Sequence, residues 1–382
     1  MDFELTNRQK QIRMAAREFA EGELVPIGKE CETKGEFPRD VIKKAAQLGF
    51  VGVFIKRDYG GLGLGSLEDA IIHEEFWRAD PGLGQVFSQT TFGAKELVLF
   101  GTEDQKKKYL PPLVKGEWVM GFSITEPEAG SDAASAVTRA ERVGEDYVIN
   151  GNKVMISNGT EAKFLLVYCV THPEESSKSK RHSIFIVETE RPGYKADKIL
   201  GKMGLHASDT ANIYFNNVKV PKENLVGIEG NGFIQLMAFL DHSRVAVAAD
   251  AVGLSQGALE QAINYVKKRK QFGQTIASFQ VTQFKIAEMA TMVETARFLM
   301  YRAGSCLDRG NADTQWSAMA KWWASNVAVK VVDEALQLHG GYGYLDDYPV
   351  ERFYRAAKLL EIYEGTKEIQ KITIGRRILG VN

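Results

Sequence analysis

The sequence predicts a mainly α-helical protein with a central β domain, because its hydrophobic period changes twice along the chain. The pattern is helical to about residue 117, strand-like from about 118 to 228, and helical again in long segments after Gly232. A length of 382 residues exceeds what one hydrophobic core usually spans, so several subdomains are expected. Helices followed by strands and then helices do not fit a doubly wound dinucleotide fold, and no Gly-x-Gly-x-x-Gly motif follows a first strand.

Residues 1–117 predict a compact domain of short helices. Three pairs of helix-breaking residues mark the helix ends, namely Gly60-Gly61, Pro81-Gly82 and Pro111-Pro112. The segment Met1 to Glu4 carries acids and no apolar core, which argues against a secretory signal, and no run of residues approaches the length of a membrane span. We therefore expect a soluble, cytoplasmic protein.

Residues 118–228 predict a small antiparallel sheet or barrel. Asn150-Gly151 and Asn216-Asn217 are interpreted as turns, and the Ser- and Lys-rich run from Thr171 to Arg181 as a mobile surface loop. The expected strands are rich in β-branched and aromatic residues and include 147–149, 164–168, 183–187 and 213–215.

Residues 229–382 predict a helical bundle. Apolar residues recur with helical spacing in two long segments, one around Met289 and Val293 and the other around Val327 and Val331. The short link from Asp308 to Asn311 implies that these helices are antiparallel neighbours. Stripes this wide are typical of helices that also bury a face against another subunit.

The charge balance argues against nucleic acid and anionic membranes as partners. The chain has 48 basic and 49 acidic residues, a net charge of -1, and no long block of one sign. Cys31, Cys169 and Cys306 lie far apart without metal-type spacing, which is typical of a reducing compartment without disulfides. The six histidines include no His-x-x-x-His pair, so no metal site is expected. A small, locally recognised ligand fits better.

Three segments carry candidate binding chemistry, each with a purely structural alternative. The segment 121–132 begins as a strand and ends in a small-residue loop that would expose backbone amides and hydroxyls to a cofactor, or it is a capped turn. The segment 269–273 is a helix end or a pyrophosphate clamp, for which Arg269 offers forked donors. The segment 336–343 is a helix C-cap or a close backbone approach to a ligand.

Two polar positions are equally open. Asp241 and Arg244 interrupt an apolar helix, either as a mutual ion pair or as the wall of a ligand passage. Glu364 lies between Tyr363 and Gly365, in a setting that suits a desolvated general base for a carbon-bound proton. The alternative is a helix N-terminus with a Thr366 cap, in which Glu364 is an ordinary solvated acid.

The order of these motifs identifies a family resemblance. The sequence resembles the acyl-CoA dehydrogenase family over essentially its whole length. The motifs that carry the resemblance are Thr125-Glu126-Pro127 through Gly130-Ser131-Asp132, Ile156-Ser157-Asn158-Gly159, Lys202-Met203-Gly204 with Ser208-Asp209-Thr210, Arg269 to Gly273, Gly340-Gly341, and Tyr363-Glu364-Gly365-Thr366.

The resemblance implies a homotetrameric flavoprotein with non-covalent FAD. It implies an N-terminal helical domain (1–117), a β-barrel domain (118–228) and a C-terminal four-helix bundle (229–382). The implied flavin-side contacts are Phe122, Ile124, Thr125, Gly130, Ser131, Met155, Ile156 and Ser157, with Thr366 and Glu368 on the other side. The pyrophosphate and adenosine would be held partly by a neighbouring subunit through Arg269, Gln271, Phe272, Phe279, Gln280, Gln337, Gly340 and Gly341.

The implied reaction is α,β-dehydrogenation of an acyl-CoA thioester, with electrons passing to an electron-transfer flavoprotein. Glu364 would remove the α-proton, and its backbone amide would help to stabilise the enolate. The implied substrate contacts are Ser131, Asp241, Ser243, Arg244 and Tyr363, with Gly365 leaving room for the acyl chain. The alternatives are an oxidase or enoyl-CoA reductase of the same fold, and a binding protein for flavin or acyl-CoA without turnover.

The sequence also departs from the family pattern. Met155 stands where many members carry tryptophan, and Ser243 stands where some branches place the base, so Glu364 is the one candidate base. The stretch 85–92, expected at the far end of the acyl cavity, has no Arg or Lys. This disfavours a dicarboxylyl substrate such as glutaryl-CoA, which needs a cation there. We therefore expect a short- or medium-chain, or alicyclic, monocarboxylyl-CoA.

Overall fold

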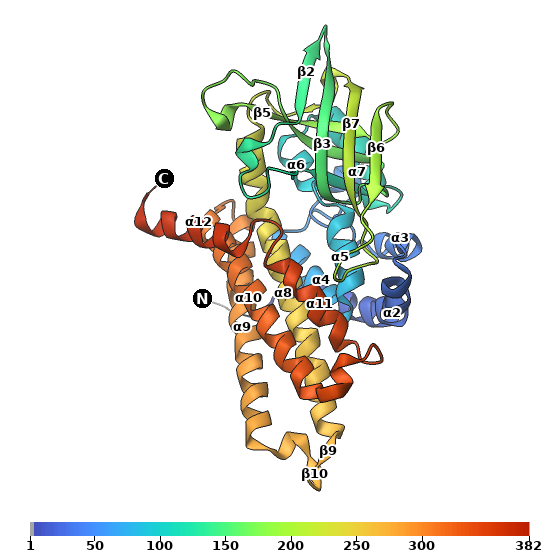
Figure 1. Cartoon of the computed structure of the whole chain (residues 1–382), viewed down its shortest axis with the longest axis vertical. Helices are drawn as coiled ribbons and strands as arrows, with labels where there is room; N and C mark the ends of the chain where they lie inside the picture. The colour runs from blue at the N-terminus through green and yellow to red at the C-terminus, as the bar shows by residue number, and fades with distance from the viewer. Residues whose placement is uncertain (1–3, 382) are drawn as a thin grey trace.

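The computed structural model describes residues 4–381, and residues 1–3 and 382 lie outside the description. The molecule is elongated, with a β domain at one end, long helices that run to the other end, and the N-terminal helices packed along one side (Figure 1). Within residues 4–381, no helix is both long enough and apolar enough to cross a membrane.

The N-terminal helices enclose an aromatic core. They are α1 (Asn7–Phe19), α2 (Val25–Lys34), α3 (Arg39–Gln47), α4 (Ser66–Ala79), α5 (Pro81–Thr90), α6 (Ala94–Phe100) and α7 (Glu103–Val114). The rings of Phe76 and Phe87 meet at 4.9 Å, and Phe19 packs against both. Pro111 and Pro112 were expected to end a helix but lie inside the last turn of α7. The helix ends within two residues of Pro112, so the interruption is short.

The middle of the chain forms one mixed sheet. Its strands are β1 (Met120–Ser123), β2 (Arg139–Val143), β3 (Asp146–Ser157), β4 (Phe164–Val170), β5 (His182–Glu188), β6 (Tyr194–Lys198), β7 (Thr210–Val220) and β8 (Leu225–Val226). The order is β6-β7-β3-β2-β4-β5-β8, with β1 parallel to β4. Within the described residues, β6 and β8 are the open ends of this path, so the expected closure into a barrel is not confirmed. The sheet is also not purely antiparallel.

Two predicted turns are wrong, because both lie inside long strands. Asn150-Gly151 lies within β3, and Asn216 and Asn217 form a β-bulge in β7 and together oppose Asn150. The two strands bend together there, since Asn217 N–H donates to Asn150 Oδ1 (2.7 Å) and Asn150 Nδ2 donates to Asn217 Oδ1 (3.2 Å). The real hairpin turn is Gly144-Glu145, between the paired residues Val143 and Asp146.

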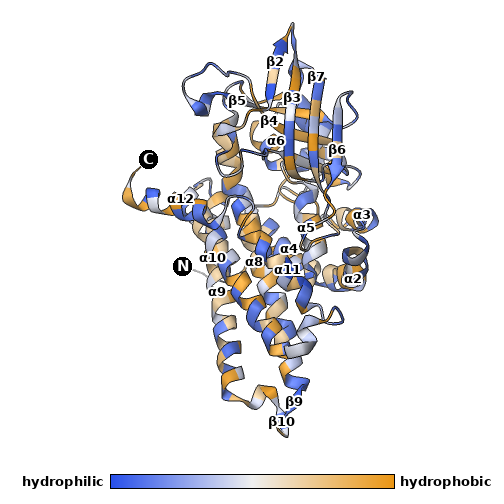
Figure 2. Ribbon diagram, in the orientation of Figure 1, coloured by the Kyte–Doolittle hydropathy of each residue, from blue (hydrophilic) through white to orange (hydrophobic). Residues whose placement is uncertain are grey.

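The C-terminal helices form the bundle that the apolar stripes predicted. They are α8 (Gly232–Lys268), α9 (Gln280–Asp308), α10 (Thr314–His339), α11 (Val350–Leu360) and α12 (Lys367–Leu379). Their shared core includes Val252, Met289, Val331 and Phe353. Figure 2 shows apolar residues along the inner faces of these long helices.

The segment after α8 is not a simple helix stop. A small hairpin of β9 (Lys270–Gln271) and β10 (Gln274–Thr275) follows, and its turn is Phe272-Gly273. Both turn residues have positive φ, 52° and 80°, as a two-residue hairpin of this type requires. The glycine therefore serves the hairpin rather than a helix C-cap.

Candidate active site

Glu364 lies in a strained turn between α11 and α12. Its φ is 56° and that of Gly365 is 87°, so two successive residues adopt the left-handed conformation. Gln370 Nε2 donates to both of their carbonyl oxygens (3.0 Å each), and Lys321 Nζ on α10 donates to Gly365 O (2.7 Å). Since a non-glycine residue in this conformation costs on the order of 1–3 kcal/mol, these bonds are what hold Glu364 in place.

The Glu364 carboxylate has one engaged oxygen. Ser243 Oγ on α8 donates to Glu364 Oε2 at 2.6 Å. Among residues 4–381, no hydrogen bond reaches Oε1, and the Glu364 backbone N–H donates to no group. The turn therefore presents a free carboxylate oxygen and a free amide donor close together.

The surroundings of Glu364 favour a base over a permanently charged acid. Burial raises the pKa of the Glu364 carboxyl above its usual value, while Ser243 and the charges of Lys321 and Arg244 oppose this shift. Burial also lowers the pKa of Lys321 to about 8, against the effect of Glu364. A carboxylate with a raised pKa accepts a weakly acidic proton more readily.

A cleft of about 260 Å³ opens at Glu364 between the β domain and the bundle. We call it the Glu364 cleft. From the β domain it is lined by Ile124, Thr125, Gly130 and Ser131, and from the bundle by Leu240, Arg244, Glu364 and Gly365. The structure thus brings the predicted 121–132 loop, the α8 residue Arg244 and the predicted base into one site.

A buried ion pair fixes the loop on the β-domain side of this cleft. Lys153 Nζ donates to Ile124 O (2.8 Å) and to Glu126 Oε1 (2.9 Å), and both side chains are almost fully buried. Glu126 also accepts from the N–H groups of Val137 (2.7 Å) and Thr138 (2.9 Å). The loop between these points is therefore tied at both ends.

The other predicted flavin-side residues lie next to this loop. Val154 N–H donates to Thr125 O (2.9 Å), which places Met155 beside the cleft loop. Met155 has a φ of 56° and is 66% exposed, so an apolar side chain is held in solvent by a strained backbone. Phe122 and Ile156 are buried and support the loop from behind. Thr366 caps α12, and Glu368 is exposed in the first turn of this helix.

A second groove, of about 450 Å³, lies at the opposite end of the bundle. We call it the Arg269 groove. It is lined by Arg269, Gln271, Gln337, Gly340 and Gly341, which the sequence predicted together. Among the described residues Arg269 forms no ion pair, and its guanidinium lies over the Tyr342 ring at 5.4 Å. Phe272, 93% exposed, and Gln280 lie on the nearby hairpin and at the start of α9, with Phe279 between them.

Comparison with known proteins decides the identity. The chain matches three family models: the acyl-CoA dehydrogenase N-terminal domain (residues 6–117), the middle domain (121–218) and the C-terminal domain (230–379). The chain belongs to the acyl-CoA dehydrogenase family. Members are FAD-dependent oxidoreductases that act on CH–CH bonds.

Individual relatives cover the dehydrogenase almost end to end. It is 42% identical to acryloyl-CoA reductase (NADH) of Anaerotignum propionicum, over 99% of this chain and 96% of the relative. It is 41% identical to the short-chain specific acyl-CoA dehydrogenase of Clostridium acetobutylicum, over 99% and 100%. A glutaryl-CoA dehydrogenase from Mycobacterium smegmatis, solved in complex with FADH2, is 27% identical with a TM-score of 0.93, over 98% and 95%.

One further solved structure is of special interest. It is described as the electron transferring flavoprotein of Acidaminococcus fermentans, in work on flavin-based electron bifurcation. The matching chain is 43% identical to the dehydrogenase with a TM-score of 0.96, covering 99% of this chain and all of the other.

The predicted substrate-side residues of the dehydrogenase do not all reach the Glu364 cleft. Asp241 pairs with Arg244 (3.3 Å) and accepts from Thr314 Oγ1 (2.8 Å), so it orients Arg244 from behind. Tyr363 points elsewhere, because its hydroxyl donates to Gln85 Oε1 at 3.3 Å. Gly365 does line the cleft, and a Cβ at this position would also meet Gln370 Nε2 at 2.7 Å.

Sequence reasoning missed several residues of this site. Lys321 and Lys153 hold the base and the cleft loop from positions remote in sequence, whereas Gln370 lies only five and six positions from the two carbonyl groups that it holds. A third cavity was predicted only in part. The stretch 85–92 lines it through Ser88, Gln89, Thr91 and Phe92, and Lys95, three residues further on, lines it as well. We call this cavity the Lys95 pocket. The stretch 85–92 has no Arg or Lys, as the sequence indicated, but Lys95 just beyond it lines the same pocket.

Proposed function

We propose that this dehydrogenase oxidises a short- or medium-chain, or alicyclic, monocarboxylyl-CoA to the 2-enoyl-CoA, with Glu364 as the base. The observation that carries the proposal is the Glu364 turn, which lines the cleft and whose carboxylate Oε1 and amide N–H have no hydrogen-bond partner among residues 4–381. A thioester carbonyl that accepts from the Glu364 N–H would become a better proton donor at its α-carbon, and Oε1 would receive the proton.

The residues present fit FAD. The Thr125 and Ser131 hydroxyls face the Glu364 cleft, and the Arg269 groove offers a guanidinium without an ion pair beside two glycines whose Cβ positions are open. Bound FAD would accept the hydride from the β-carbon. Ser243 would keep its hydrogen bond to Oε2 throughout, so the carboxyl group stays oriented while Oε1 gains the proton.

Two further parts of the proposal concern partners. The cleft and the groove lie at opposite ends of the bundle in one chain, which supports a homotetramer in which neighbouring copies complete each FAD site. Electron-transfer flavoprotein as the acceptor is supported by the similarity to a chain solved in work on such a flavoprotein.

The reverse direction is a second candidate, because one relative at 42% identity is named an acryloyl-CoA reductase. The same Glu364 turn would then deliver a proton instead of removing one. Anaerobic flavin spectra separate the candidates. In a dehydrogenase, saturated acyl-CoA thioesters should bleach the oxidised flavin rapidly. In a reductase, the faster reaction should be the reoxidation of reduced flavin by enoyl-CoA, which restores the colour. Oxygen consumption with peroxide release would instead identify an oxidase.

The decisive variant is Glu364→Gln. We expect it to retain FAD absorbance but to lose bleaching by every thioester in a panel of straight, branched and cyclic acids, by a factor of roughly 10³ or more in rate. Glu141→Gln, an exposed carboxylate on β2 that does not line the Glu364 cleft, is the matched control and should bleach normally. Near-normal turnover of Glu364→Gln would refute the proposal, and absence of bound FAD in the wild type would revive a non-catalytic binding role.

A further inference from the structure

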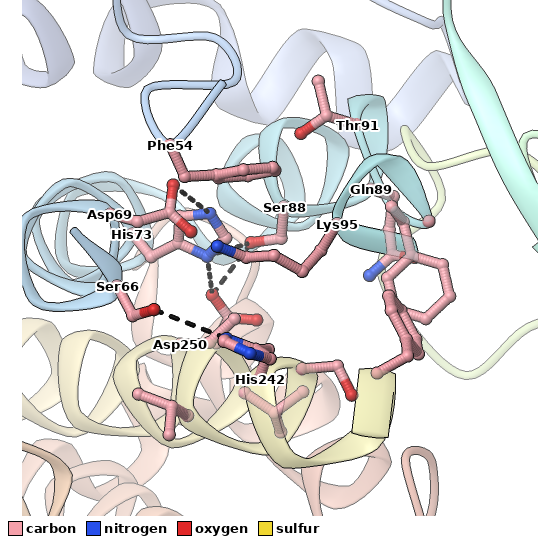
Figure 3. Close-up of a pocket in the computed structure, with 17 residues that line it drawn as sticks. Phe54, Ser66, Asp69, His73, Ser88, Gln89, Thr91, Lys95, His242 and Asp250 are labelled. Atoms are coloured by element: carbon pink, nitrogen blue, oxygen red, sulfur yellow. Dashed lines mark hydrogen bonds and ion pairs between the residues drawn. The ribbon is translucent and has the colours of Figure 1, made fainter. Parts of the chain in front are cut away.

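One hydrogen bond links the Lys95 pocket to the Glu364 cleft. Ser243 lines the pocket and donates to Glu364, which lines the cleft. Figure 3 shows the ammonium group of Lys95 inside the pocket, in the neighbourhood of His73, Asp250 and His242. The stretch 85–92, expected at the far end of the acyl cavity, contributes Ser88, Gln89, Thr91 and Phe92 to the lining of this pocket.

We propose that the Lys95 pocket receives the far end of the acyl group and selects a neutral oxygen acceptor there, a ketone or a hydroxyl, through the Lys95 ammonium group. The inference rests on the proposed function and names the substrate class of the same site. It differs from the expectation of a purely hydrocarbon acyl group.

The Lys95 ammonium group has donors to offer. Among the described residues it forms no hydrogen bond and no ion pair, and its one close contact is the Phe54 ring, with Nζ 4.3 Å from the centroid. Its nearest opposite charges, on Asp69 and Asp308, act at longer range, and burial lowers the pKa of Lys95. A half-buried ammonium group without hydrogen bonds has lost part of its hydration, so an acceptor brought by the substrate would recover that loss.

The other charged groups in and beside the pocket are already engaged. His73 Nδ1 contacts Asp250 Oδ1 at 3.0 Å, and its Nε2 lies 4.0 Å from Asp69 Oδ1. Ser88 Oγ donates to Asp250 Oδ1 at 2.8 Å. Asp308 accepts from the N–H of Leu67 at the start of α4 (3.0 Å). Lys95 is therefore the charged group of this cluster whose N–H donors have no acceptor among the described residues.

The charges favour a neutral acceptor over a carboxylate. The two carboxylates flanking His73 raise its pKa to about 9 against the effect of burial, so it is protonated at neutral pH. Burial lowers the pKa of His242 to about 4, so His242 is neutral. Within the pocket, Asp69 and Asp250 then balance two cations, His73 and Lys95, while Asp308 lies outside its lining and is exposed. A substrate carboxylate would add a third negative charge with no further cation to offset it.

The size of the pocket limits the acyl group. Its free volume is about 60 Å³. One water needs roughly 10–15 Å³ by the same measure, so the pocket takes only a few non-hydrogen atoms. Phe92 and Phe239 pack edge to face at 5.2 Å and supply an apolar wall for the carbons that precede the oxygen. His242 can donate to a ketone or accept from a hydroxyl.

The test compares matched thioesters that differ only at the far end: hexanoyl-CoA with 5-oxohexanoyl-CoA, and pentanoyl-CoA with 4-oxopentanoyl-CoA, with glutaryl-CoA as the anionic arm. The readout is kcat/KM for flavin reduction. We expect the wild type to favour the better-fitting oxo compound over its parent by roughly tenfold or more, because a hydrogen bond to a charged donor is gained. Lys95→Met should cut kcat/KM for that oxo compound by roughly 10- to 100-fold and leave the parent compound almost unchanged.

Lys107→Met, on the exposed face of α7, is the matched control and should leave every ratio as in the wild type. Equal use of oxo and parent compounds by the wild type would overturn the inference without any variant, as would a preference for glutaryl-CoA or an equal effect of Lys95→Met on both members of a pair. Failure of every thioester to bleach the flavin would instead remove the proposed function, and this inference with it. Bleaching by hexanoyl-CoA without an oxo preference removes this inference alone.

Discussion

At the scale of single residues, three of the six non-glycine residues with positive φ among residues 4–381 lie at or beside the candidate sites. Glu364, Met155 and Phe272 are non-glycine residues with positive φ, of 56°, 56° and 52°. The first carries the proposed base, the second stands beside the cleft loop, and the third forms the tip of the hairpin near the Arg269 groove. Since such conformations persist only where surrounding contacts impose them, their positions mark places where geometry outweighs local stability.

Lys321 should set the working pH of Glu364. It donates to Gly365 O, and its charge lowers the Glu364 pKa while burial raises it. Lys321→Met removes the charge, so the Glu364 pKa should rise and the acid limb of the kcat/KM profile should move to higher pH. The effect should be clear below pH 8, because the pKa of Lys321 itself is about 8 and the charge is present there.

The measurement is flavin reduction by one good thioester from pH 5 to 9. Lys330→Met, an exposed position on the same helix, should leave the profile in place. A shift of the acid limb to lower pH, or an unshifted profile with lower rates throughout, would mean that Lys321 supports the turn without tuning the base.

The sequence could indicate Glu364 but not its partners. An acid between an aromatic residue and a glycine is visible as a pattern, and the Thr366 cap that competed with it as an explanation is also present. The contacts that make Glu364 a base come from Ser243 and Lys321, which are 121 and 43 positions away. Lys95 was missed for the same reason, because only the packing of α6 against α4 and α8 shows that it enters a pocket.

At the scale of elements, the buried pair Lys153 and Glu126 ties the cleft loop to β3. Lys153→Met should lower the free energy of unfolding by about 3–5 kcal/mol, because it leaves the Glu126 carboxylate buried without its cation. FAD affinity should fall as well, since the loop from Ile124 to Ser131 loses one of its ties.

Adding Glu126→Gln to Lys153→Met should restore part of the lost stability, because the uncompensated charge is then removed. Denaturant unfolding and FAD absorbance measure the two effects. Lys195→Met on exposed β6 is the control and should change stability by less than about 0.5 kcal/mol. Additive losses in the double variant would show that the pair is not coupled.

The helices and strands were largely predictable, and the turns were not. Apolar periodicity located the bundle helices and the strands β3, β4, β5 and β7. Asn150-Gly151 and Asn216-Asn217 are residue pairs typical of turns. Neither closes a turn, because Asn150 and Asn217 form hydrogen bonds with each other across the two strands. Local signals fix a preference for irregular backbone, and long-range pairing decides whether that irregularity is a turn or a bulge.

At the scale of the whole molecule, the hairpin of β9 and β10 should be part of the proposed subunit interface. Phe272→Ser removes a side chain that is 93% exposed in one chain, so the monomer should remain folded. We expect a smaller oligomer by light scattering and a lower FAD content. Val143→Ser, an exposed apolar residue at the end of β2, should alter neither. An unchanged mass with full FAD content would place the hairpin outside the interface.

The length of α8 has a mechanical consequence. One uninterrupted helix carries Ser243 near one end and leads into Arg269 at the other, 26 residues or about 39 Å away. A rod of that length turns a tilt of one degree into a displacement of roughly 0.7 Å at its far end. This displacement is a large fraction of the distance by which the 2.6 Å hydrogen bond between Ser243 and Glu364 can lengthen before it is lost. Packing that tilts α8 at its Arg269 end would therefore misalign Ser243 with the Glu364 carboxylate at the other end.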